Sequence, residues 1–181
     1  MEIRPAIQIQ AMIKSMIDVV LPAVDPEHKM AQEQAQLIIG TLKMMGQRLP
    51  LQFRYDRKEL DEYVALSVEL LKQMRGSEKT QSAMKELGAS QVEGAAVLDR
   101  ARAEPGELET AVFDLRAKVG ALVKAVGADG EAASRDALKH LILDAAENQL
   151  QRELSWQAAL GYSDPAELQP IENLIGVSPA R

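Results

Sequence analysis

Apolar residues recur at helical spacing along most of the chain, and residues 4–24 show this pattern most broadly. Four of them follow one another at intervals of three or four residues: Ile9, Ile13, Met16 and Val20. This spacing places them on one face of a helix. Neighbouring apolar residues widen that face beyond what a surface helix needs. We therefore expect the helix to be central in a bundle or to contact a second chain, with these four residues as its candidate interface.

A second helix is expected after a break at Pro22, which should end or kink the first one. Asp25 is suited to an N-cap and Pro26 to the first helical position that follows it. The apolar positions then alternate at spacings of four and three residues, as in a helix–helix seam. These positions are Ala31, Ala35, Ile38, Leu42, Met45 and Leu49.

Two capping boxes predict the starts of later helices. Asp56 with Glu59 would open a third helix after a loop at residues 49–55, and Ser90 with Glu93 would open another one. In each pair an acidic side chain lies three residues after a good N-cap residue. The stretch just before Ser90 is then expected to be only a short helix or turn.

The second half of the chain contains the most regular seam, with spacings of 4-3-4-3-4. Its members are Leu108, Val112, Leu115, Val119, Leu122 and Val126. A long helix is expected from about residue 131 to 160, followed over residues 163–181 by a short helical turn and an irregular tail. No segment shows the alternation of a strand. We predict an all-α fold, an antiparallel bundle of about six helices.

The bundle is expected to form one domain over residues 1–162, because no stretch has the composition of a flexible linker. Two subdomains, residues 1–76 and 77–162, are the alternative division.

Composition narrows the function classes. The chain has 181 residues, of which 46% are hydrophobic and only 3% aromatic, a balance that favours packed helices. Its net charge of −6 argues against nucleic acid as a partner, since phosphate binding rests on Lys and Arg. There is no cysteine, which excludes disulfides, thiolate ligands and cysteine nucleophiles. We expect no cofactor.

The N-terminal residues lack the layout of a signal peptide, and no uncharged apolar run is long enough for a membrane span. We therefore expect a cytoplasmic protein with no membrane partner.

The segment 48–58 combines cationic and aromatic residues in an otherwise acidic protein. Its members are Arg48, Arg54, Tyr55, Arg57 and Lys58. Beside a helix start they could bind a phosphate, a carboxylate or a partner protein. The alternative is that the arginines pair with acidic neighbours in the same chain. We keep these five as candidate ligand- or anion-binding residues.

One histidine lies near two acidic residues at helical spacing: His140, Asp144 and Glu147. They share a face and could in principle bind a metal ion. However, that face lies opposite the apolar centre of the helix, and the Glu-x-x-His motif of di-metal bundles is absent. The solvated-face interpretation is favoured over the metal site.

Sequence motifs for phosphate loops, dinucleotide binding and nucleophile elbows are absent. The leading hypothesis is a non-enzymatic helical bundle that acts by association, as a homodimer or as an accessory to a partner enzyme. The alternative is a protein that binds a small molecule or acyl ligand, or a cryptic enzyme, with an internal pocket lined by methionines.

The stretch "IKSMIDVVLPAVDPEHKMAQEQAQLIIGTL" resembles a family of small bacterial helical proteins of unknown function. In that family a first helix ends in a similar "VLPA" and a second helix has an Ala-rich seam. The genes lie beside those of aminoglycoside-phosphotransferase-like kinases and acyl-CoA dehydrogenases. The resemblance covers about the first quarter of the chain and implies an accessory role near acyl-CoA metabolism. It brings no catalytic residues.

Overall fold

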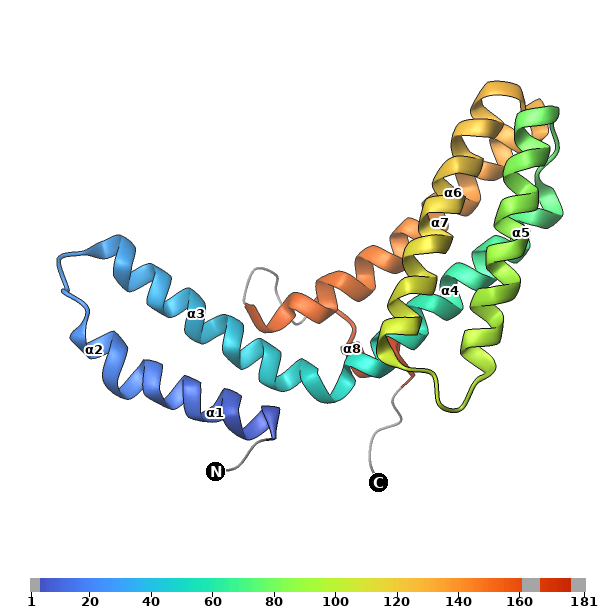
Figure 1. Ribbon diagram of the computed structural model, residues 1–181. Helices are drawn as coiled ribbons and strands as arrows, with labels where there is room; N and C mark the ends of the chain where they lie inside the picture. The colour runs from blue at the N-terminus through green and yellow to red at the C-terminus, as the bar shows by residue number, and fades with distance from the viewer. Residues whose placement is uncertain (1–3, 161–166, 177–181) are drawn as a thin grey trace. The chain divides into compact units, whose positions relative to one another are not determined.

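The computed structural model describes residues 4–160 and 167–176 and confirms the all-α class (Figure 1). The long helices of this part number six if α1 and α2 are counted as one, as predicted. The helices are α1 (Pro5–Ser15), α2 (Leu21–Ala23), α3 (Lys29–Arg48), α4 (Gln52–Gln73), α5 (Glu78–Asp99), α6 (Pro105–Asp129), α7 (Ala132–Gln157) and α8 (Ile171–Leu174). A π-helical turn spans Met16–Val20, and 3-10 turns span Leu49–Leu51 and Ala158–Leu160.

The chain divides into two compact units. The central unit is Phe53–Leu150, and the terminal unit combines Met1–Gln52 with Gln151–Arg181. Because the terminal unit is discontinuous in sequence, this division does not coincide with the sequential halves 1–76 and 77–162. The two units are described separately below.

The core of the central unit forms around the 4-3-4-3-4 seam of α6. All six seam residues are buried, from Leu108 to Val126. They belong to one apolar cluster with Leu60 and Leu70 of α4 and Leu87 of α5. The seam predicted from sequence is therefore confirmed, since a fully apolar stripe has only one face to bury.

The structure contradicts the predicted capping box at Ser90, because α5 is one continuous helix from Glu78 to Asp99. Ser90 is buried inside it, as is Gly94. A Cβ added to Gly94 would lie 3.0 Å from Cδ1 of Leu115 and 3.2 Å from Cγ2 of Val64. The small residues thus serve close helix packing, which the sequence pattern could not distinguish from a helix start.

The predicted loop at residues 49–55 and the capping box of Asp56 and Glu59 are also wrong. A 3-10 turn at Leu49–Leu51 leads directly into α4, which begins at Gln52. Pro50 fits this turn because its fixed φ and missing N–H are tolerated at a first helical position. Both acidic residues therefore lie inside α4 rather than at its start.

One end of the central unit is held by a backbone bridge between two glycines and by a side-chain cap. Gly76 and Gly130 form an isolated antiparallel bridge, and a Cβ on Gly76 would lie 2.9 Å from the Cα of Gly130. Asp129 caps the start of α5: its carboxylate accepts hydrogen bonds from the amides of Lys79, at 2.8 Å, and Thr80, at 3.0 Å. The Thr80 hydroxyl donates to the same carboxylate at 2.6 Å. That hydroxyl is the main reason why the pKa of Asp129 lies below its ordinary value.

In the terminal unit, the helix of residues 5–23 runs back along α3 as a hairpin (Figure 1). Ile9 and Ile13 are buried in this contact, as are Ala35 and Ile39 of α3. The helices approach closely at Gly46, where an added Cβ would lie 3.3 Å from Cγ2 of Ile9.

The hairpin turn differs from the prediction at the start of α3. His28, rather than Asp25, is the N-cap: its Nδ1 accepts the amide of Ala31 at 3.2 Å. Asp25 instead accepts the amide of Glu27 at 2.9 Å within the turn. Asp and His can both accept such hydrogen bonds, so the N-cap could not be assigned from residue type alone.

The end of α7 is capped by Arg48 from α3. Its Nε donates to the carbonyl of Trp156 and its Nη2 to the carbonyl of Ser155, both at 3.0 Å. The guanidinium lies over the Trp156 ring, 5.6 Å from the centroid. The last carbonyls of a helix have no partner within it, and Arg48 supplies one.

In the tail, Ile171 and Ile175 are buried, so this part is more than the irregular tail that we expected. The helical turn expected near Asp164 lies largely outside the described residues.

Candidate functional site

The two units differ sharply in how they use hydrophobic residues. Among described residues, the terminal unit buries six hydrophobic residues but exposes eleven large ones, whereas the central unit buries twelve and exposes six. Exposed apolar patches on this scale mark interaction surfaces. The terminal unit is therefore where we look for a functional site.

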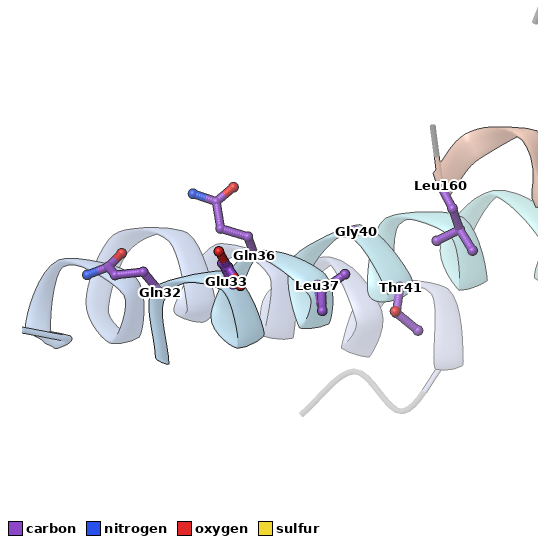
Figure 2. A pocket seen from close by; sticks show the side chains of 7 residues that line it. All are labelled: Gln32, Glu33, Gln36, Leu37, Gly40, Thr41 and Leu160. Atoms are coloured by element: carbon purple, nitrogen blue, oxygen red, sulfur yellow. The ribbon is translucent and has the colours of Figure 1, made fainter. Parts of the chain in front are cut away.

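Much of the exposed apolar surface lies along α3, beside the stripe that packs on α1. Its members are Met30, Leu37, Ile38 and Met45, which are 48 to 71% exposed. At 3.6 residues per turn, this second stripe lies roughly 130° around the helix from the buried one at Ala35 and Ile39. Figure 2 shows that Gln36 and Leu37 leave α3 on different sides.

The preceding helix adds to the same side of the hairpin. Met12 and Val20 are 46% and 41% exposed. They are displaced from the buried residues Ile9 and Ile13 in the same direction around the helix axis as Met45 is displaced from the buried residues of α3. Two antiparallel helices place such positions on one side of their common plane. We call this surface the apolar side: Met12, Val20, Met30, Leu37, Ile38 and Met45.

The six residues of the apolar side are uncharged, and Arg48, three residues after Met45 at the end of the same face, is held by the carbonyls of Trp156 and Ser155. The polar positions between its members are uncharged and exposed, namely Gln8, Ser15, Gln34 and Thr41. The ion pair of Lys14 with Asp18, 2.6 Å apart, and Lys43 lie away from this surface, whereas Glu33 lies at its edge, one helical turn from Met30 and from Leu37. Residues 1–52 hold five acidic and five basic residues, so the net charge of −6 arises in the remainder of the chain.

A π-helical turn changes the helix phase before Pro22, which explains why the four candidate interface residues of the first helix differ in burial. The amide of Leu21 donates to the carbonyl of Met16, five residues earlier, which adds one residue to the turn before Pro22. Pro22 has no N–H to continue the normal ladder. As a result Leu21 is half-buried and Val20 is exposed.

Of the same four residues, Ile9 and Ile13 are buried in the hairpin and Met16 is half-buried. An interface on this helix would therefore use Val20 together with Met12. Sequence reasoning missed Met30 and Leu37, although their seven-residue spacing, repeated at Ile38 and Met45, was a signal for a second stripe.

The cationic candidates near residue 50 mostly contact their own chain. Within the central unit, Arg57 donates from Nη2 to the carbonyl of Leu98 at 2.8 Å, near the end of α5. Lys58 lies 3.3 Å from Asp61 and 3.6 Å from Glu62. Tyr55 is half-buried in α4, and Arg54 is exposed. Arg48 belongs to the terminal unit, where it caps α7. The anion-binding hypothesis stays a prediction, carried chiefly by Arg54.

The histidine face of α7 is exposed at all three positions, His140, Asp144 and Glu147. No group of three or more His, Cys, Asp or Glu side chains within residues 4–160 and 167–176 is arranged to hold a metal ion. The structure thus does not bring these three residues together as a metal site.

A depression of about 540 Å³ lies on the terminal unit beside α3 (Figure 2). Its lining is Gln32, Glu33, Gln36, Leu37, Gly40, Thr41 and Leu160. Six of these residues follow one helix and none is a methionine, so this is not the Met-lined pocket of the ligand-binding alternative. Met12, Met30 and Met45 are exposed instead.

The helix of residues 5–23 is long and apolar enough, by length and composition, to cross a membrane. A single such helix near an N-terminus is weak evidence for a span. This helix also carries the charged pair Lys14 and Asp18.

No protein family, curated protein or solved structure matches the chain. The resemblance to the small bacterial helical proteins therefore stays a prediction.

Proposed function

We propose that this protein is a non-enzymatic association protein that forms a homodimer through the apolar side of its N-terminal hairpin. The observation that carries the proposal is an uncharged, largely apolar surface on a unit that buries few of its own hydrophobic residues. Contact between water and such a surface is unfavourable, and packing against a second apolar surface would exclude the water.

The size of the surface supports a dimer. If a fully exposed large side chain offers roughly 150–200 Å², the exposed fractions of the apolar side and the adjoining Leu49 and Val19 leave roughly 700 Å² per copy. A standard protein–protein interface buries about 800 Å² on each partner.

Charge supports the same partner. A two-fold interface brings identical surfaces together, so a charge near the dyad would face the same charge of the second copy. The six residues of the apolar side carry no charge, and residues 1–52 are neutral as a whole. With no basic excess, this segment also lacks the attraction to anionic lipids and nucleic acids that Lys- and Arg-rich surfaces have. We propose a cytoplasmic location in keeping with this.

The test is the molar mass of the full chain by light scattering, compared between two matched substitutions. Ile38→Asp places a charge on the apolar side, and Gln36→Asp places the same charge on the opposite side of α3. We expect the native protein and Gln36→Asp to be dimers and Ile38→Asp to be a monomer with unchanged helix content.

Two results would contradict the proposal. One is a native protein whose mass stays at 19.8 kDa at high concentration. Binding of that monomer to neutral phosphatidylcholine vesicles would then assign the apolar side to a membrane. The other is equal loss of the dimer in both variants, which would place the interface elsewhere.

A further inference from the structure

The second stripe of α3 reads the same in both directions. From its N-terminal end the residues are Met30, Gln34, Leu37, Ile38, Thr41 and Met45, with spacings of 4-3-1-3-4. The outermost pair is methionine, the next pair is polar and uncharged, and the central pair is a large aliphatic residue. The pattern is symmetric about the point between Leu37 and Ile38.

This symmetry has a geometric meaning for a two-fold dimer. When two copies of one helix pair antiparallel about a dyad, residue i faces residue j of the second copy and the sum of the two numbers is constant. A dyad between Leu37 and Ile38 sets that sum at 75. Met30 then faces Met45, Gln34 faces Thr41, and Leu37 faces Ile38.

Gln34 and Thr41 fit this arrangement because each faces the other residue of the second copy, with which it can form a hydrogen bond. A buried amide or hydroxyl without a hydrogen bond destabilises an interface. The Gln34 amide can both donate and accept, and so can the Thr41 hydroxyl. Both residues are exposed in the single chain. A polar pair at a fixed position would also disfavour slipped registers, in which it would face apolar side chains.

Charges at the ends of α3 favour the antiparallel direction. The turn before α3 carries Asp25 and Glu27, and the last residue of α3 is Arg48. In the antiparallel register, Glu27 of one copy is level with Arg48 of the second, whose guanidinium stays on the end of its own α7. A parallel pair would instead bring the acidic turns of both copies together and align the two helix dipoles.

We infer that the partner on the apolar side is a second copy of this chain, with its α3 antiparallel to the first α3 about a dyad between Leu37 and Ile38, so that the two hairpins form an intermolecular four-helix bundle. This inference rests on the proposed function, to which it adds the direction and register of the interface.

Cysteine crosslinking tests the register cleanly because the chain has no cysteine of its own. The test uses two full-length variants, Gln34→Cys and Thr41→Cys, one of which carries a tag that changes its size. A disulfide needs Cα atoms within about 7 Å. In the inferred register residue 34 faces residue 41 of the second copy, whereas two copies of residue 34 are offset by about 10 Å along the axis.

After re-equilibration and mild oxidation, we expect the mixture to give mainly the mixed crosslinked dimer. Each variant alone should crosslink at least ten-fold less. The matched control is the mixture of Gln36→Cys with Lys43→Cys, both on the charged side of α3, which should not crosslink.

The outcomes separate the two proposals. Strong crosslinking of each variant with itself would indicate parallel pairing, and crosslinking of the control as strong as that of the mixture would indicate random collision. Either result, in a protein that is a dimer by light scattering, overturns the register and leaves the dimer standing. A protein that is a monomer by light scattering overturns both.

Discussion

The amide of Leu21 donates to the carbonyl of Met16, and the π-helical turn that this bond closes sets which residues of the first helix face α3. It shifts the helix by one residue, so that Leu21 is half-buried and Val20 is exposed. Without the shift, the spacing from Ile9 and Ile13 would place Val20 inside the hairpin.

The shift predicts that two neighbouring substitutions affect different properties, hairpin stability and dimerisation. Leu21→Ala should lower the free energy of unfolding of the hairpin by roughly 1–2 kcal/mol, about half the cost of removing a fully buried Leu side chain. Val20→Ala should leave unfolding at low protein concentration nearly unchanged and weaken dimerisation. Chemical denaturation followed by circular dichroism compares them. A larger loss of stability for Val20→Ala would show that the helix has no such shift.

The cap that Asp129 provides to α5 should make stability depend on pH. Hydrogen bonds from Thr80, chiefly its hydroxyl, and from the Lys79 amide lower the pKa of this carboxyl below its ordinary value of 3.8. The unfolded chain therefore binds the proton more readily than the folded one. The stabilisation is complete above the unfolded pKa and is lost as the pH falls through the folded pKa.

Asp129→Ala should accordingly lower the Tm at neutral pH, and the difference from the native protein should shrink below pH 3.8. Thermal unfolding at a series of pH values measures this. Glu131→Ala, at an exposed neighbouring position, serves as the control. A Tm difference that persists unchanged into the acid range would argue against the carboxylate as its source.

Two glycines in helices should respond oppositely to alanine. At Gly94 an added Cβ would meet the buried Leu115 at 3.0 Å, whereas at Gly120 nothing lies within 4 Å. Gly120→Ala should stabilise the protein by about 1 kcal/mol through helix propensity. Gly94→Ala should destabilise it by roughly 1–2 kcal/mol, because overpacking outweighs that gain. Urea unfolding gives both values, and stabilisation by Gly94→Ala would contradict the close approach of α5 and α6.

Arg48 should not be replaceable by lysine. The guanidinium bonds two carbonyls at the end of α7 and covers the ring of Trp156, and an ammonium group cannot do both. Arg48→Lys should cost roughly 1–2 kcal/mol of stability and shift the fluorescence of Trp156, the one tryptophan. Arg54→Lys, at an exposed position, is the matched control. An unchanged spectrum in Arg48→Lys would contradict the stacking.

The sequence predicted the fold correctly where the apolar pattern of a helix allowed only one face to be buried. The α6 seam is apolar at every helical repeat, so its burial followed directly. The starts of α4 and α5 were mispredicted because Asp56 and Ser90 have the side chains of caps but lie in helices, where tertiary packing overrides local preference. The shift at Leu21 could not be read from spacing, since it depends on how the chain accommodates Pro22.

The interface stays a prediction, and the exposed apolar residues that could form it are mostly not the ones chosen from the sequence. The breadth of the first helix indicated a second contact, but Ile9 and Ile13 are buried within the hairpin. The exposed stripe at Leu37 and Ile38 was not recognised in the sequence, because the spacing assigned Ile38 to the buried seam. In the structure Ile39 is the buried residue. A one-residue difference in helix phase decided which side is free for a partner.

The most direct test of the central claim is the native mass spectrum of the untreated full chain, recorded over a dilution series. We predict a species of twice 19.8 kDa with no added mass, which dissociates only on strong dilution and is absent in Ile38→Asp. A native chain that stays at 19.8 kDa at every concentration would contradict self-association through the apolar side.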